Sequence, residues 1–408
     1  MTPEPNLSPE LDHHRRLAIE ACRGVPGVTG LGIGGRIQGG ERTGEMAVTV
    51  FVERKKPLDS LSRDDRLPDG VADLPIDVQE LGRPTPAGAL EEAVLWGSYP
   101  HRHTEWLKPA PVLVSGGSIR AQVRGGQNGT LGCFLAEGDR HFLLTNMHVL
   151  TGAKGGFFDL PVAGETVVGS PNASRTVFPC CGREIGRFAH GFKVFDSTEV
   201  DDDTFWWDVP GPDAALVELE PGVTYAPQID DLTPITGWET IGADDVCGLE
   251  PYVVYKRGIN TRWTVGVVAC VGFIVHGRED EFGANSFTNP FISDSDIVIR
   301  PIQDPNRPTR TNYFAGHGDS GAVAVNRNGA IVALVHSLIP TAPTAGPGEE
   351  LVVGDAVATR FDSVMRSLQA DPDLAGIELV TATYLNDIRT VPESSARSTA
   401  VVRSRSGA

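Results

Sequence analysis

Short apolar runs separated by turn residues dominate the chain from residue 126 onward. The clearest of them are Gly129–Leu135, His141–Leu144 and Ile331–Leu338. Runs of this length between turns are typical of β-strands, and the 47 glycines and 30 prolines agree with a chain that turns often. Ala358–Leu368 instead has helical spacing. The pattern therefore predicts a mainly β region over residues 126–375 that ends with one late helix.

The N-terminal part has a different pattern, in which a helical segment comes before the strands. After a leader over residues 1–11 that we expect to be disordered, helical spacing runs from His13 to Cys22. The segments that follow are a strand over Gly27–Ile37, a strand over Ala47–Val52, a short polar helix over Leu58–Arg66 and a strand over Pro75–Leu81. These elements predict a small α+β accessory module over residues 12–90.

Two further regions flank the β region. Residues 91–125 are rich in proline, glycine and scattered aromatic residues, which indicates a linker or an arm against a neighbouring surface. Residues 376–408 form a C-terminal extension whose Ser, Arg and Ala tail we expect to be disordered from about Val391. With 408 residues, the chain is long enough for about two to three domains.

Charge and composition exclude several kinds of partner. The net charge is −18, whereas a nucleic-acid-binding protein normally presents a basic face. No apolar run approaches the roughly 20 residues that span a bilayer, and Met1–Arg16 lacks the apolar core of a signal peptide. We therefore expect a cytoplasmic protein with no nucleic-acid or membrane partner.

No cofactor is expected either. The run Gly30–Gly35 is glycine-rich, but a strand pattern continues through it, whereas a dinucleotide site needs a strand, a turn and a helix. Six cysteines without a C-x-x-C pair predict buried, reduced thiols rather than a zinc site or a disulfide framework. His101–His103 lacks a third ligand, and Asp201–Asp203 lacks the spacing of a calcium loop. We predict no metal.

A Gly-Asp-Ser-Gly motif at residues 318–321 is the strongest indication of chemistry. Small residues on both sides of Ser320 permit a sharp turn that directs backbone N–H groups at one point. A serine hydroxyl needs a base to act as a nucleophile. His148 follows an apolar run that ends in Thr-Asn, and Asp213 opens the strand-like run Asp213–Leu219. We assign Ser320 as nucleophile, His148 as general base and Asp213 as the residue that orients His148.

The choice of aspartate has alternatives. Other candidates lie nearby in the sequence: Asp196, Asp201, Asp202, Asp203 and Asp208. Asp213 is preferred because the apolar run after it would anchor it at the edge of a core strand.

The order His148, Asp213, Ser320 is the order that chymotrypsin-type peptidases use. Residues 128–370 resemble a trypsin-like serine peptidase of the chymotrypsin fold. The Leu-Thr-Asn-x-His-Val form of the motif around His148 resembles bacterial high-temperature-requirement proteases. The whole layout, including the N-terminal segment, is similar to that of bacterial relatives of the plant narrow-leaf proteins. The resemblance implies a chymotrypsin-like double β-barrel, with the second barrel beginning in Tyr252–Val271.

The resemblance also implies the roles of further residues. The N–H groups of Gly318 and Ser320 would form the oxyanion hole, while Asp319 would stabilise the loop. In secreted relatives that aspartate meets a new N-terminus after activation, but this sequence shows no activation motif. The implied substrate pocket comprises Phe314, Ala315, His317, Val335, His336 and Ser337. It contains no acidic residue, so we expect an apolar or small residue before the cleaved bond rather than arginine or lysine.

These observations predict a serine endopeptidase that hydrolyses peptide bonds through an acyl-enzyme, with a peptide or protein as substrate. They leave open whether it forms a homo-oligomer. Two other functions stay open at this point. A catalytically silent scaffold could bind peptides or partners with the same fold, and an esterase could use the same triad.

Overall fold

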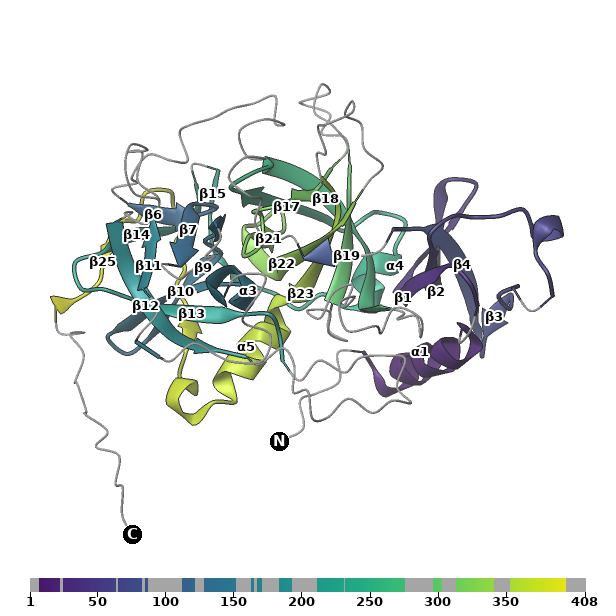
Figure 1. Cartoon of the computed structure of the whole chain (residues 1–408), viewed down its shortest axis with the longest axis horizontal. Coiled ribbons are helices and arrows are strands. Elements are labelled where there is room, and N and C mark those ends of the chain that lie inside the picture. Colours follow the sequence, from purple (N-terminus) through teal and green to yellow (C-terminus); the bar gives the residue numbers. More distant parts are fainter. Residues whose placement is uncertain are drawn as a thin grey trace, which may run out of the picture.

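The computed structural model describes residues 7–22, 25–63, 65–82, 85–86, 112–121, 128–151, 163–164, 167–170, 183–192, 211–230, 232–275, 296–302, 313–340 and 353–393. Three regions are visible in Figure 1: two strand-rich halves side by side and a smaller N-terminal part at one end. Within the described residues, no helix is long and apolar enough to cross a bilayer.

The first half is built on an eight-stranded sheet. Its strands are, in chain order, β7 (Ser118–Ala121), β8 (Asn128–Thr130), β9 (Cys133–Glu137), β10 (Arg140–Thr145), β11 (Val167–Ser170), β12 (Arg183–Gly191), β13 (Ala215–Leu219) and β24 (Glu378–Leu379). Their order across the sheet is β24-β9-β10-β13-β12-β11-β7-β8. Helix α3 (Met147–Thr151) follows β10. Figure 1 shows this sheet wrapping into a barrel-like half.

A four-stranded sheet completes the first half. It contains β6 (Leu113–Ser115), β14 (Thr224–Ile229), β15 (Thr233–Pro234) and β25 (Arg389–Thr390). The two sheets share one apolar cluster, in which Tyr225 and Val391 pack with Phe134 and Leu143. Val391 is buried and donates a backbone hydrogen bond to Val223, so the ordered chain extends to the residue where we predicted the disordered tail to begin.

The second half is a closed six-stranded barrel. Its strands are β17 (Val253–Gly258), β18 (Arg262–Val275), β19 (Asp296–Pro301), β21 (Val323–Val325), β22 (Ala330–Pro340) and β23 (Val353–Arg360). They follow the order β17-β21-β22-β23-β19-β18, and β17 also pairs with β18, which closes the ring. Short strands add to it: β5 (Thr85–Pro86) and β16 (Gly237–Trp238) pair with β22, and β20 (Ala315–Gly316) pairs with β23. The protein therefore has the predicted chymotrypsin-like double-barrel fold.

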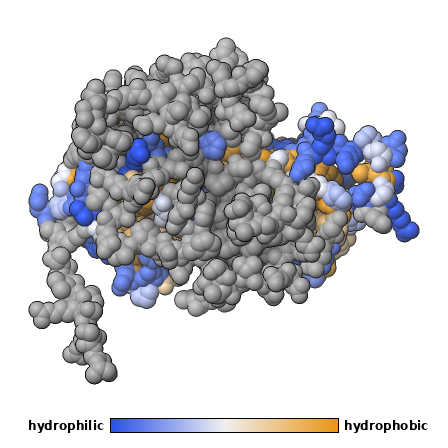
Figure 2. All heavy atoms as spheres, viewed as in Figure 1, coloured by the Kyte–Doolittle hydropathy of each residue, from blue (hydrophilic) through white to orange (hydrophobic). Residues whose placement is uncertain are grey.

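The N-terminal part continues the sheet of the second barrel. Helix α1 (Pro9–Cys22) precedes strands β1 (Val28–Gln38), β2 (Glu41–Val52), β3 (Gly70–Val71) and β4 (Leu74–Glu80). Strand β1 pairs with β18, and side chains of α1 and β1 share an apolar cluster with the barrel. On the face shown in Figure 2, hydrophilic side chains gather at the outer end of this part.

The glycine-rich run explains how β1 approaches β18 so closely. A Cβ atom at Gly30 would lie 2.6 Å from the carbonyl oxygen of Ile274, and one at Gly34 would lie 2.4 Å from that of Ala269. Any larger residue would push the two strands apart. The strand continues through Gly30–Gly35 as expected, and its glycines serve packing.

Helix α1 begins four residues earlier than predicted, and Leu7 before it is buried, so the predicted disordered leader does not extend to residue 11. The local signal was present in the sequence. The Ser8 hydroxyl accepts a hydrogen bond from the Leu11 N–H (3.2 Å), and Pro9 occupies the first turn, where its missing N–H costs nothing.

Two other predicted helices differ from the structure. Over Leu58–Arg66 only a 3-10 turn forms, η1 (Leu58–Ser60), because this polar segment has no buried face and Leu58 is 71% exposed. The late helix is α5 (Phe361–Gln369), whereas Ala358–Arg360 belong to β23. Pairing of β23 with β19 and β22 outweighs the local helical spacing there. The other helices among the described residues are α4 (Ala243–Cys247) and η4 (Pro372–Leu374).

Cys22, Cys133, Cys247 and Cys270 are buried free thiols, as expected, and Cys180 and Cys181 lie outside the described residues.

Candidate active site

His148, in helix α3, follows strand β10, and Asp213 lies two residues before strand β13, at the same end of these two neighbouring strands. Strands β10 and β13 pair so that Thr145 lies opposite Ala215, which places the residues just beyond Thr145 next to those just before Ala215. His148 Nδ1 lies 2.5 Å from Asp213 Oδ2, and the His148 backbone N–H donates to Asp213 Oδ1 (3.1 Å). Asn146 Nδ2 donates to the Asp213 carbonyl oxygen (2.6 Å), which fixes the backbone of the aspartate.

Both oxygens of the buried Asp213 carboxylate thus have partners on His148. An acceptor at Nδ1 keeps the proton of a neutral imidazole on that atom, which leaves Nε2 with the lone pair that a general base needs. The pair therefore has the geometry of an oriented base. The alternative aspartates, Asp196, Asp201, Asp202, Asp203 and Asp208, lie outside the described residues.

Ser320 lies in the turn between β20 and β21, and both barrels hold this turn. On the side of the second barrel, the Gly321 N–H donates to the Val335 carbonyl of β22 (2.9 Å). On the side of the first barrel, the Thr130 N–H donates to the Ser320 carbonyl and Thr130 Oγ1 donates to the Gly318 carbonyl, both at 2.8 Å. Ser320 is therefore fixed where the two barrels meet.

Gly321 makes this close approach possible. It has φ +92°, and a Cβ atom there would lie 2.2 Å from the Thr130 carbonyl oxygen and 2.3 Å from Thr145 Oγ1. Thr145 is the last residue of β10, three positions before His148. The same contact thus brings the serine turn against the end of the strand that precedes His148.

The Ser320 hydroxyl donates a hydrogen bond to the His336 carbonyl oxygen (3.2 Å). Ser320 has no exposed surface and His148 is 4% exposed, so both side chains are enclosed by protein. Catalytic hydrogen bonds in enzymes without substrate are often long and tighten only in the complex. The reactivity of the Ser320 hydroxyl is therefore the property to measure first.

The turn also presents backbone donors. Gly318 has φ +91°, a conformation that side chains rarely tolerate. Among the described residues, neither the Gly318 N–H nor the Ser320 N–H donates to another protein group, whereas Asp319 N–H between them donates to the Gly316 carbonyl (3.0 Å). Two such donors, one on the serine and one two residues before it, can stabilise an anionic oxygen.

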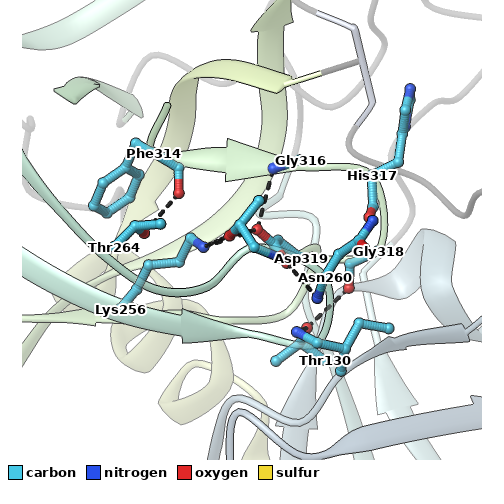
Figure 3. A network of polar contacts seen from close by, with 11 residues as sticks. Thr130, Lys256, Asn260, Thr264, Phe314, Gly316, His317, Gly318 and Asp319 are labelled. Atoms are coloured by element: carbon cyan, nitrogen blue, oxygen red, sulfur yellow. Dashed lines mark hydrogen bonds and ion pairs between the residues drawn. The ribbon is translucent and has the colours of Figure 1, made fainter. Parts of the chain in front are cut away.

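The residues predicted to form the substrate pocket differ in their burial and in their contacts. Phe314 and Ala315 have no exposed surface and belong to the apolar core of the second barrel. Val335 holds the serine turn through its backbone. The His317 carbonyl accepts a hydrogen bond from Asn260, and Figure 3 shows the His317 ring pointing away from the polar network below it.

His336 and Ser337 take part in a second buried His–Asp pair that the sequence analysis did not single out. His336 Nε2 lies 3.2 Å from Asp296 Oδ2, and Nδ1 lies 2.8 Å from Ser337 Oγ. Burial by itself would lower the pKa of His336, but the Asp296 carboxylate, aided by Asp213, raises it above its ordinary value of 6.5. The available signal was an aspartate at the start of an apolar strand, Asp296-Ile-Val-Ile, the same signature that marked Asp213.

A buried ion pair also lies directly behind the serine turn. Lys256 Nζ lies 2.8 Å from Asp319 Oδ2, and neither side chain has exposed surface. From the sequence, Lys256 was only part of the run that opens the second barrel. Among the described residues, no three His, Cys, Asp or Glu side chains gather as a group that could hold a metal ion.

Comparison with known proteins gives matches in structure but not in sequence. No protein-family model matches the chain, and no curated protein sequence does. Thermobifida fusca protease A is 13% identical, with a TM-score of 0.36 over 66% of this chain and 100% of its own. A Nocardiopsis protease is 13% identical, with a TM-score of 0.34 over 65% of this chain and 97% of its own. Cellulomonas bogoriensis chymotrypsin is 14% identical, with a TM-score of 0.33 over 66% of this chain and 98% of its own. At these scores, the strand pairing described above carries the fold assignment.

Proposed function

We propose that this protein is a serine endopeptidase that works through an acyl-enzyme on Ser320. The observation that carries the proposal is the buried contact between His148 Nδ1 and Asp213 Oδ2 beside a Gly-Asp-Ser-Gly turn that both barrels hold. Within the part of the chain that the structure describes, the N–H groups of Gly318 and Ser320 donate to no other protein group. A structural serine would require none of this arrangement.

In the proposed reaction, His148 Nε2 removes the proton of the Ser320 hydroxyl as Oγ bonds to the peptide carbonyl carbon. The N–H groups of Gly318 and Ser320 stabilise the resulting oxyanion, at about 3–4 kcal/mol for each donor. His148 then gives the proton to the leaving amine, and the C–N bond breaks. Water hydrolyses the ester by the same route, with His148 again as base. Asp213 keeps the imidazole oriented throughout.

The proposed specificity is for a substrate with an apolar or small residue before the cleaved bond. Phe314 and Ala315 provide no carboxylate to pair with arginine or lysine, and both belong to the apolar core of the second barrel. We also propose a cytoplasmic location, which the buried thiols support. We also propose that the protein is related to bacterial relatives of the plant narrow-leaf proteins. The N-terminal strands that precede the two barrels in the chain support this relation.

A fluorophosphonate probe tests the proposal directly, because it phosphonylates only an activated serine. We expect one adduct per chain, located on the peptide that contains Ser320 by mass spectrometry, and no adduct in Ser320→Ala. Ser337→Ala is a matched control, because Ser337 is a second buried serine near the turn. Labelling that persists in Ser320→Ala would contradict the proposal.

The enclosure of Ser320 favours one second candidate, a catalytically silent scaffold that binds peptides or partners. The hydroxyl has no exposed surface and donates to the His336 carbonyl. A folded protein that resists the probe and also fails to cleave a peptide library would support the scaffold. Cleavage of small esters without cleavage of any peptide would instead support an esterase.

A further inference from the structure

The Asp319 carboxylate is the best-partnered acid among the described residues around Ser320. Oδ2 accepts from Lys256 Nζ (2.8 Å), from the Gly316 N–H (3.1 Å) and from the Thr261 hydroxyl. Oδ1 accepts from the backbone N–H groups of Asn260 (3.0 Å) and Thr261 (3.2 Å). Figure 3 shows this network converging below the turn. Five donors therefore hold the side chain of the residue just before Ser320.

Lys256 is the only ammonium group in this network, and it is completely buried on β17. Its Nζ also donates to Thr261 Oγ1 (2.5 Å) and lies 5.5 Å from the centre of the Phe314 ring. The one carboxylate that faces it is Asp319, and the charge next to it on the strand is Arg257, which pairs with Asp230. An ammonium buried in this way is stable only with an opposite charge in contact.

The strand that carries Lys256 is shaped around this contact. A Cβ atom at Gly258 would lie 2.2 Å from Asp319 Oδ1 and 2.3 Å from its carboxyl carbon. Only a glycine leaves the carboxylate room to reach both Lys256 and the N–H groups of Asn260 and Thr261.

The ion pair is made by the residue that lies between the two expected oxyanion donors. Gly318 and Ser320, whose N–H groups would meet the oxyanion, are its direct neighbours, and the Asp319 N–H and carbonyl close the turn onto Gly316 and Ala322. If the carboxylate lost its cation, it would gain by rotating toward water, and the peptide planes next to it would turn with it. The direction of the two donors therefore depends on where the Asp319 side chain is held.

We propose that Lys256 is a positioning residue. Through Asp319, it holds the serine turn in the conformation in which the N–H groups of Gly318 and Ser320 would face the oxyanion. This inference rests on the proposed function. Because the cation is a side chain within the folded barrel, the oxyanion donors form when the chain folds, and no cleavage that creates a new amino terminus is needed.

The first experiment compares Lys256→Met with Arg257→Met in the full-length chain. Arg257 neighbours Lys256 on β17, and its ion pair with Asp230 lies outside the turn network. We expect kcat for a cleaved peptide, and the rate of fluorophosphonate labelling, to fall about 10²–10³-fold in Lys256→Met, the size of effect that follows loss of an oxyanion donor. KM should change less than about threefold, and Arg257→Met should change neither parameter by more than that. A folded Lys256→Met with the wild-type kcat would overturn the proposal.

A second measurement does not depend on activity, so it separates this inference from the proposed function. Hydrogen exchange in the peptide covering residues 314–322 reports on the N–H groups of Asp319, Gly321 and Ala322, which are all hydrogen-bonded in the turn. We expect faster exchange of this peptide in Lys256→Met, with unchanged exchange over residues 140–150. Equal protection in both proteins would overturn the role of Lys256 even if the wild type proves inactive. An inactive wild type with a loosened turn in the variant would reject the proposed function alone.

The dependence of kcat on pH distinguishes a lysine that positions the turn from one that is merely structural. Burial lowers the pKa of the Lys256 ammonium, Asp319 opposes that shift and Arg257 adds to it. Wild-type kcat should therefore fall at alkaline pH as Lys256 loses its proton, before an ordinary lysine would, and Lys256→Met should lack this fall. If Lys256→Met does not fold, Thr261→Val removes the hydroxyl that bridges Nζ and Oδ2 and should lower kcat about tenfold. An unchanged kcat in that variant would contradict the proposal.

Discussion

Among the described residues, two His–Asp pairs have both side chains buried, one pair in each barrel, and the two pairs differ in where the histidine ring lies. His148 meets Asp213 through Nδ1 at the edge of the first barrel, where the serine turn of the second barrel packs. His336 meets Asp296 through Nε2, and its Nδ1 faces the Ser337 hydroxyl. Both nitrogens of His336 thus face partners within its own barrel.

The backbone contributes to the same contrast. The Asp213 carboxylate also binds the backbone N–H of His148, so histidine and aspartate are held by one short segment. Asp296 instead uses its second oxygen to accept from the Thr359 hydroxyl of β23 (2.7 Å), which ties adjacent strands together. His336 supplies only its carbonyl oxygen to Ser320. The two pairs therefore differ in their surroundings: the His336 pair is tied into its own barrel, whereas the His148 pair lies where the serine turn of the other barrel packs.

Removing either reactive group should have the largest effect. Ser320→Ala and His148→Ala should each lower kcat about 10⁶-fold, and the double substitution should be little worse, because triad members act as a unit. Steady-state peptide hydrolysis by the purified proteins measures this. His336→Ala, if it folds, should retain far more activity than His148→Ala. Normal activity in either of the first two variants would refute the triad.

Changing the aspartate to asparagine should affect the two pairs differently, with a loss of activity for one pair and a loss of stability for the other. Asp213→Asn should leave the protein folded and slow it about 10⁴-fold, because the amide favours the wrong imidazole tautomer. Pre-steady-state acylation rates test this. Wild-type behaviour of Asp213→Asn would point to one of the aspartates between positions 196 and 208, and asparagine substitutions at each of those would identify it.

Asp296→Asn should instead affect stability, with less than about a tenfold change in kcat. The free energy of unfolding should fall by about 3 kcal/mol at acidic pH, because a protonated His336 would lose its buried counter-charge. Glu45→Gln, which breaks an exposed pair with Arg36, should cost less than about 1 kcal/mol. Urea unfolding monitored by fluorescence measures both values, and equal losses in the two variants would contradict a structural role for Asp296.

The same pair predicts a pH dependence with a defined sign. The pKa of His336 is raised in the folded state, so the pair stabilises the fold fully below the unfolded value of about 6.5. This contribution disappears as the pH rises through the higher folded pKa. The stability difference between wild type and Asp296→Asn should therefore be largest near pH 5 and shrink above neutrality. A difference that grows with pH would show that the sign is wrong.

The N-terminal part should have the smallest effect on activity. A fragment beginning near Lys108 loses β1, which covers β18, so it should be less stable and prone to aggregate while its folded fraction keeps kcat within about threefold. Gly34→Ala should weaken the same contact in the full chain, whereas Gly237→Ala, whose Cβ would meet no atom within 4 Å, should not. Thermal unfolding and light scattering report these effects. A changed oligomer size or cleavage pattern would instead indicate that this part controls access or assembly.

The sequence by itself determined the features that adjacent residues encode. The Gly-Asp-Ser-Gly turn, the apolar run before His148 and the aspartate at the start of β13 are all local, because neighbouring residues set the backbone angles and the end of a strand. The strand pattern of the double barrel was readable for the same reason. Local spacing was misleading at Ala358–Arg360, which β19 and β22 bind into the sheet, and at Leu58–Arg66, where no buried face supports the predicted helix.

Only the tertiary structure decided which distant residues meet. Lys256 and Asp319 are 63 residues apart, and no local pattern distinguishes this lysine from one in a solvated strand. His336 with Asp296, and β1 with β18, depend in the same way on which strands are neighbours and on their register. Burial then makes these contacts important for stability. An unpaired charge inside a barrel lowers the free energy of unfolding strongly, whereas one on the surface changes it little.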